Sequence, residues 1–242
     1  ASFASDLDDA KEDEDIDAII DVANEIAEAG DKDWAKSIYK EIESGIERDS
    51  NCIDPLLMIG NGACEVFGDK DWAKSVFEVV EFEAYDFDHY FDLSRSVARC
   101  LDDKDWLTKL FKHTETLADD CFGFYSLADN ICEYLGEKKW ATELYKKAEN
   151  NANSVDEWRK LANGLTLKLG DKEWGKKAYK QAEPLANTHR EYRILGLDIK
   201  NNLGDHQWGK KCFSKAIELV NTDGEEWEVE DYQIEFTENF EK

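Results

Sequence analysis

The sequence has few of the residues that interrupt helices. Only two prolines, Pro55 and Pro184, occur in 242 residues, and because proline ends or kinks helices, this scarcity favours long helical segments. No run of about 18 apolar residues is present, which excludes a membrane-spanning helix. The N-terminal stretch ASFASDLDDAKEDEDID lacks both a basic start and an apolar run, so we expect no signal peptide.

The cysteines lack the spacing of a cross-linked or metal-binding framework. None lies in a CxxC pair, and disulfide frameworks are typical of small, loop-rich secreted domains. The sequence also lacks an N-x-S/T glycosylation acceptor. We therefore predict free thiols and a cytoplasmic protein. The six cysteines are Cys52, Cys64, Cys100, Cys121, Cys132 and Cys212.

Acidic residues dominate the composition, but they are distributed unevenly. The net charge is −26, and residues 1–100 contribute 27 acidic and 9 basic side chains. Residues 101–222 carry 20 of each sign, whereas residues 223–242 carry nine acids and one lysine. This charge should repel bare nucleic acid and anionic membranes. It leaves the acidic N-terminal third as a candidate surface for a basic protein.

A tryptophan recurs at one point of a regular cycle. Successive members are 38, 34, 34, 34 and 34 residues apart, within segments such as GDKDWAKSIYK and GDKEWGKKAYK. A period of this length is typical of helical-repeat proteins, whose repeats share one continuous core. The six tryptophans are Trp34, Trp72, Trp106, Trp140, Trp174 and Trp208.

Residues 156–187 show how one cycle predicts two helices. Its first half spaces apolar residues by three and four, which indicates one face of a helix. Gly170 stands where a helix commonly ends, and Asp171 is suited to cap the next one. Trp174 then begins the second helix, where we expect a buried indole that covers the turn and seals the seam to the next repeat. A small residue recurs in the first helices, which predicts close approach of the neighbouring helix.

This pattern resembles the tetratricopeptide repeat, a 34-residue helix–turn–helix with the signature W-x2-L-G-x2-Y, then A-x3-F and P. Trp158, Leu161 and Ala162 match the first part. Most first helices here are one residue longer before the turn, and the terminal proline is missing. The second-helix matches are Ala35/Tyr39, Ala73/Phe77, Leu107/Phe111, Ala141/Tyr145, Gly175/Tyr179 and Gly209/Phe213.

The resemblance covers residues 14–222 and implies an all-α, right-handed α-solenoid of about six helix–turn–helix repeats. In that family the first helices line a concave face that binds peptides or partner helices. Asparagine suits such a face because it both donates and accepts hydrogen bonds, and two arginines four residues apart could clamp a carboxylate. The alternative is an ordinary solvated helix face. One row of this face is expected to hold Asn24, Asn61, Arg95, Asp129, Asn163 and Leu197, and the flanking rows Arg99, Arg159 and Arg193. All of these except Leu197 are the expected partner-binding residues.

No local pattern predicts chemistry. The four histidines form neither a pair nor an HExxH motif, and DFDHYFD lacks the glycine and glutamate of a calcium loop. GNG at residues 60–62 has no following Lys-Ser/Thr and is no phosphate-binding loop. We therefore predict no enzymatic activity, no cofactor and no metal site.

The sequence divides into an acidic N-terminal arm (residues 1–13), a six-repeat solenoid (14–222) and an acidic C-terminal cap or tail (223–242), for which helix and strand both remain open. Our leading hypothesis is a non-enzymatic scaffold or adaptor that binds a partner peptide or helix. One alternative is an acidic inhibitor or immunity-type protein that neutralises a basic, nuclease-like partner. Another is a self-assembling protein, in which lysines of the later second helices meet the acidic end of another copy.

Overall fold

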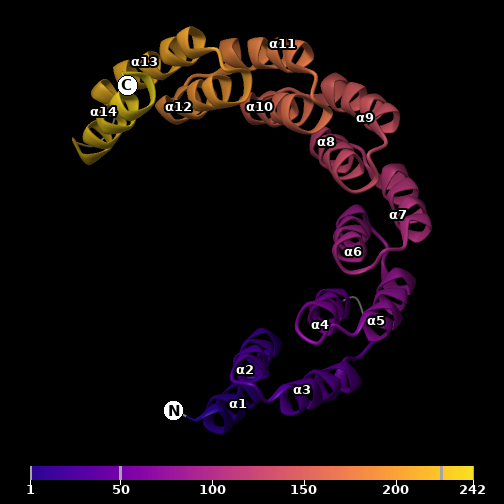
Figure 1. Ribbon diagram of the computed structural model, residues 1–242. Coiled ribbons are helices and arrows are strands. Elements are labelled where there is room, and N and C mark those ends of the chain that lie inside the picture. The colour runs from indigo at the N-terminus through magenta and orange to yellow at the C-terminus, as the bar shows by residue number, and fades with distance from the viewer. Residues whose placement is uncertain (1, 49–50, 224–225, 242) are drawn as a thin grey trace. The chain divides into compact units, whose positions relative to one another are not determined.

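The computed structural model describes residues 2–48, 51–223 and 226–241. These ranges form helices joined by turns and contain no strand, which confirms the predicted all-α class. The chain divides into two compact units, Ala1–Leu117 and Ala118–Lys242, and each is described by itself (Figure 1).

Unit 1 is built from helical hairpins preceded by one further helix. The first helices α2, α4 and α6 lie in one layer and the second helices α3, α5 and α7 lie in another (Figure 1). Residues 2–12 of the predicted arm include α1, whose Leu7 and Ala10 are buried. Ala1 lies outside the described residues. The helices are α1 (Phe3–Glu12), α2 (Ile16–Glu28), α3 (Lys32–Gly45), α4 (Ile53–Glu65), α5 (Lys70–Glu83), α6 (Phe87–Cys100) and α7 (Lys104–Leu117).

Unit 2 repeats the same arrangement, with α8, α10 and α12 side by side and α9, α11 and α13 in the second layer (Figure 1). The segment left open between helix and strand forms α14; residues 224–225 and 242 lie outside the described residues. The elements are α8 (Cys121–Asn130), η1 (Ile131–Leu135), α9 (Lys138–Asn151), α10 (Val155–Gly164), η2 (Leu165–Leu169), α11 (Lys172–Ala182), η3 (Glu183–Leu185), α12 (His189–Asp198), η4 (Ile199–Leu203), α13 (His206–Asp223) and α14 (Glu226–Phe240).

The hairpin turns follow the predicted chemistry. Gly170 has φ +84°, and the Asp171 side chain accepts a hydrogen bond from the Trp174 backbone N–H at 2.9 Å. Both assignments are confirmed, because glycine adopts the left-handed conformation without a Cβ clash and a capping carboxylate satisfies an exposed N–H group. The same cap joins Asp31 to Trp34, Asp69 to Trp72, Asp103 to Trp106 and Asp205 to Trp208.

The extra residue of the first helices is accommodated by a change of helix type. In unit 2, η1, η2 and η4 are π-helical turns that each end at a left-handed glycine. A π turn holds more residues than an α turn, so it can accommodate an added residue within the helix. The departure from the tetratricopeptide length therefore lies at the end of each of these helices.

Small residues allow the paired helices of a hairpin to approach closely, as predicted. In the α12–α13 pair, a Cβ added to Gly196 would lie 2.7 Å from the backbone oxygen of Gly209, and one added to Gly209 would lie 2.6 Å from that of Gly196. Backbone cannot move aside as a flexible side chain can, so both positions require glycine.

Trp72, Trp106, Trp174 and Trp208 contact the preceding hairpin, whereas we predicted a seam to the next one. The Trp72 indole lies edge-on to Tyr39 with ring centroids 6.4 Å apart, and its Nε1 donates to Glu43 at 2.9 Å. Of the six recurring tryptophans only Trp72 is buried, and the other five are half-buried. Full burial was therefore wrong for those five, because the indoles lie at the layer surface with a polar edge to satisfy. Equivalent bonds join Trp106 to Glu81, Trp174 to Glu149 and Trp208 to Glu183.

Candidate functional site

The predicted row of first-helix residues divides according to its partner on the second helix. Where the second helix carries tyrosine, the row residue accepts the tyrosine hydroxyl, as in the bond of 2.7 Å from Tyr39 to Asn24. Equivalent bonds run from Tyr145 to Asp129 and from Tyr179 to Asn163. These three row residues are used inside their own hairpins.

The other members of the row face a phenylalanine, which has no hydroxyl to donate. Asn61, Arg95 and Leu197 each stand 16 residues before Phe77, Phe111 and Phe213. Leu197 packs against the apolar cluster of α13 and α14. Asn61 and Arg95 are therefore the polar residues of the row that have no tyrosine hydroxyl as a partner.

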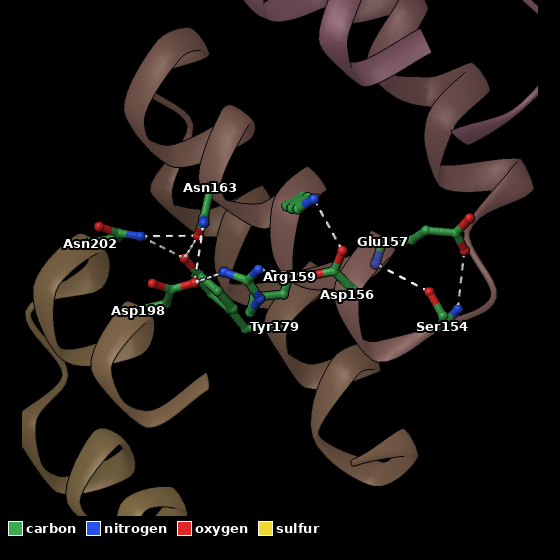
Figure 2. A network of polar contacts seen from close by, with 9 residues as sticks. Ser154, Asp156, Glu157, Arg159, Asn163, Tyr179, Asp198 and Asn202 are labelled. Atoms are coloured by element: carbon green, nitrogen blue, oxygen red, sulfur yellow. Dashed lines mark hydrogen bonds and ion pairs between the residues drawn. The ribbon is translucent and has the colours of Figure 1, made fainter. Parts of the chain in front are cut away.

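In unit 2 the row is tied into a network between neighbouring first helices (Figure 2). Arg159 of α10 donates to Asp198 of α12 and to Asp156 of α10, at 2.7 Å in both cases. Asn163 donates to Asp198 at 3.1 Å, and its oxygen accepts from Asn202 at 3.0 Å. Both predicted residues therefore meet on this surface, and their hydrogen-bonding groups are engaged with α12 and η4.

In the hairpin before this network, Asp129 introduces a carboxylate where Asn24 and Asn163 carry amides. Burial raises the pKa of Asp129 to about 6, and the hydrogen bond from Tyr145 opposes part of that rise. The charge of Lys168 also lowers this pKa, whereas that of Glu133 raises it. Asp129 is thus a group that titrates well above an ordinary aspartate.

In unit 1, three predicted residues meet at a depression between α4 and α6. Asn61, Arg95 and Arg99 line a volume of about 270 Å³ together with Asp54, Asp92 and three other side chains. The Arg95 guanidinium lies 5.9 Å from the Phe91 ring centroid, and among the described residues it forms no ion pair or hydrogen bond. Arg99 is only loosely paired with Glu65, at 3.9 Å.

The electrostatics of this depression are mixed. Loss of solvent raises the pKa of Asp92, and the positive charge of Arg95 opposes that rise. The Cys100 thiol, behind the depression, lies 4.0 Å from the Asn61 side-chain oxygen, and burial raises its pKa well above that of a free thiol. A thiol with a raised pKa is a poor nucleophile, so Cys100 is not suited to covalent chemistry. The arginines and Asn61 that line the depression are suited instead to binding a ligand through charge and hydrogen bonds.

The remaining predicted arginine, Arg193 of α12, is engaged with α14. Its guanidinium forms a bidentate pair with Glu235, in which Nη2 lies 2.8 Å from Oε1. Arg190 pairs with Glu228 at 2.9 Å in the same interface. Sequence reasoning missed these glutamates, which lie on α14 opposite the arginines of α12, as Asp198 of α12 lies opposite Arg159 of α10.

Over the described ranges, no group of three or more His, Cys, Asp or Glu side chains is arranged to hold a metal ion. All six cysteines have free thiols. None of the helices in these ranges has both the length and the apolar character needed to cross a membrane.

Comparison with models of known protein families finds no match, and comparison with curated proteins finds no significant match.

Proposed function

We propose that this protein is a non-enzymatic interaction scaffold of the tetratricopeptide-like class, which binds a partner peptide through the first-helix surface of unit 1. The right-handed α-solenoid of six repeats, with that surface on its concave face, is part of the proposal. A cytoplasmic location is also part of it, and the six free thiols support a reducing compartment.

One observation carries the proposal. Asn61 and Arg95 stand opposite Phe77 and Phe111, so neither has the internal tyrosine bond that engages Asn24 and Asn163. Their polar groups open instead into the depression between α4 and α6, next to Arg99. Arg95 forms no ion pair or hydrogen bond among the described residues and is available for an external ligand, whereas the Asn61 oxygen accepts from the Cys100 thiol and leaves its amide N–H groups to donate.

The residues define what the partner segment presents. Arg95 and Arg99 can hold a carboxylate, because a guanidinium donates two parallel hydrogen bonds to its two oxygens. Asn61 can donate to and accept from a peptide backbone. Asp54 and Asp92 at the rim repel a uniformly acidic segment, which favours one carboxylate, from an acidic side chain or a chain terminus, within an otherwise neutral or basic peptide.

A capture experiment from native lysate tests the proposal. The wild-type protein is compared with Arg95→Ala/Arg99→Ala, and with Lys109→Ala/Lys112→Ala on α7 as a control that removes the same charge from a second helix of the same unit. We expect a partner that the first variant loses and the control retains. A partner retained by all three proteins contradicts the proposed site.

The acidity of unit 1 keeps the inhibitor hypothesis open as a second candidate. Residues 1–117 carry 31 acidic and 12 basic side chains, a net charge of −19. A basic partner held by this charge should be retained by the arginine variant and released by high salt, because screening weakens exposed charge pairs. Self-assembly is separated from both candidates by a size that depends on protein concentration.

A further inference from the structure

A second surface lies at the opposite end of the sequence, in the groove between α12 and α14. The groove has a volume of about 550 Å³ and is lined by Ile194 of α12 and by Trp227, Asp231, Ile234 and Glu238 of α14, among others. The three apolar side chains are exposed to 37%, 59% and 52% in the order Ile194, Trp227, Ile234. Large apolar side chains gathered at this exposure indicate an interaction site.

Helix α14 has apolar residues on two sides. Val229, Tyr232, Phe236 and Phe240 pack against the cluster that contains Phe213 of α13. Trp227, Asp231, Ile234 and Glu238 follow each other at spacings of four, three and four, so they form a separate stripe. This outer stripe faces the groove.

An arginine–carboxylate pair links α14 to α12 and also links α12 to α10. Arg159 of α10 pairs with Asp198 of α12, and its equivalent Arg193 pairs with Glu235 of α14. Helix α14 is therefore joined to α12 by an arginine–glutamate pair, as α12 is joined to α10 by an arginine–aspartate pair.

The charges around the groove specify the partner. Arg190 and Arg193 are neutralised by Glu228 and Glu235. Asp231 and Glu238 form no ion pair among the described residues, and they flank Ile234 along the stripe. The groove thus presents apolar side chains bordered by two uncompensated carboxylates.

We propose that the α12–α14 groove binds a cationic amphipathic helix of a partner protein. Its apolar side chains would cover Ile194, Trp227 and Ile234, and its lysines or arginines would pair with Asp231 and Glu238. A second copy of this chain is the other candidate occupant, although three lysines of its second helices are already held internally. Lys176 pairs with Asp205, and Lys210 and Lys215 lie over Phe236 and Tyr192.

Fluorescence anisotropy with a labelled synthetic helix tests this inference. The probe is a peptide of about 20 residues, roughly 30 Å long as a helix, with leucines spaced by three and four and lysines on the flanks. A scrambled peptide of the same composition is the comparison. We expect the scrambled peptide to bind at least about tenfold more weakly, because one face must carry all the apolar contacts.

Matched variants separate the two kinds of contact. Ile234→Gln should weaken binding about fivefold or more through the lost apolar burial, whereas Leu167→Gln, at an exposed leucine elsewhere in unit 2, should leave it unchanged. Asp231→Asn/Glu238→Gln should weaken binding and remove most of its salt dependence between about 50 and 300 mM NaCl. The control Asp119→Asn/Glu173→Gln should retain that dependence.

Several outcomes would overturn the inference: no binding by the wild-type chain, equal binding of the scrambled peptide, or an Ile234→Gln variant that binds normally. A concentration-dependent dimer that Ile234→Gln dissociates would assign the groove to self-association instead. The inference does not depend on the proposed function, because Arg95→Ala/Arg99→Ala should leave the affinity for the cationic peptide unchanged.

Discussion

Asn163 of α10 and Arg95 of α6 occupy the same position of the hairpin, two 34-residue periods apart. Asn163 is half-buried and is bonded to Tyr179, Asp198 and Asn202. Arg95 is exposed and lines the depression between α4 and α6. One position of the hairpin therefore stabilises the fold in unit 2 and presents a charged group in unit 1.

The same contrast extends to the charge of the two units. Residues 118–242 carry 25 acidic and 18 basic side chains, a net charge of −7, against −19 in unit 1. In unit 2 the first-helix acids Asp156 and Asp198 are paired with Arg159. Polar groups that hydrogen-bond to each other stabilise the fold and fix its geometry, whereas polar groups without an internal partner can bind an external ligand. The predictions below test how far the two units differ.

The largest expected effect concerns Trp72 of unit 1, the one buried member of the six recurring tryptophans. Trp72→Ala should lower the free energy of unfolding by about 3–5 kcal/mol, because it removes a buried indole together with its contacts to Tyr39 and Glu43. Trp174→Ala in unit 2 should cost less, about 1–3 kcal/mol, because that indole is half-exposed. Urea unfolding followed by circular dichroism measures both. Equal costs would contradict the difference in burial.

The next effect is a pH dependence specific to unit 2. The pKa of Asp129 is raised to about 6 in the folded protein from the ordinary aspartate value of 3.8, so between these values the folded state binds more protons than the unfolded state. Stability contributed by protonated Asp129 is then present at low pH and is lost as the pH rises through about 6, by up to about 3 kcal/mol.

Asp129→Asn isolates this contribution, because asparagine is what Asn24 and Asn163 supply at the equivalent positions. We expect the variant to be more stable than wild type at pH 7, with the difference shrinking towards pH 4, as measured by urea unfolding across this range. Asp69 is a control, since hydrogen bonds from Lys36 and the Trp72 backbone lower its pKa, so Asp69→Asn should be most harmful at neutral pH. A pH-independent difference for Asp129→Asn would refute the assignment.

Backbone contact within a hairpin gives a third test. Gly196→Ala in unit 2 should cost about 1–3 kcal/mol, because its Cβ would lie 2.7 Å from the Gly209 oxygen. Gly45→Ala in unit 1 meets no atom within 4 Å and should stabilise α3 by up to about 1 kcal/mol. Thermal and urea unfolding of both variants measure the signs. A stabilising Gly196→Ala would show that α12 and α13 are farther apart.

These residues also show which features the sequence could predict. Asp171 as a cap and Gly170 as a helix end follow from the local backbone, whose requirements depend on only a few neighbouring residues. The Glu149 partner of Trp174 does not, because it depends on how two hairpins stack. Its signal was nevertheless present, since a glutamate stands 25 residues before Trp106, Trp174 and Trp208 alike.

The sequence predicted which kinds of residue lie on the candidate surface, but not which of them are free to bind a ligand. Asn61 and Asn163 have the same side chain at the same position, and the residue 16 positions later, Phe77 or Tyr179, decides whether a tyrosine hydroxyl engages the amide. Reading the row together with its second-helix partner would have separated them. The α12–α14 groove was not predictable, because the packing of α14 depends on tertiary contacts that no periodicity records.

The smallest expected effect compares the tyrosine hydroxyls of the two units. Tyr179 donates to Asn163 and accepts from Asn202 at 2.9 Å, whereas Tyr39 has the single bond to Asn24. Tyr179→Phe should therefore cost about 1–2 kcal/mol, because two amides lose a partner within the network, and Tyr39→Phe about 0.5–1 kcal/mol. Urea unfolding of the two variants gives the difference. If Tyr39→Phe cost as much as Tyr179→Phe, the network of unit 2 would add nothing beyond single bonds, and the contrast between an engaged Asn163 and an available Arg95 would lose its energetic basis.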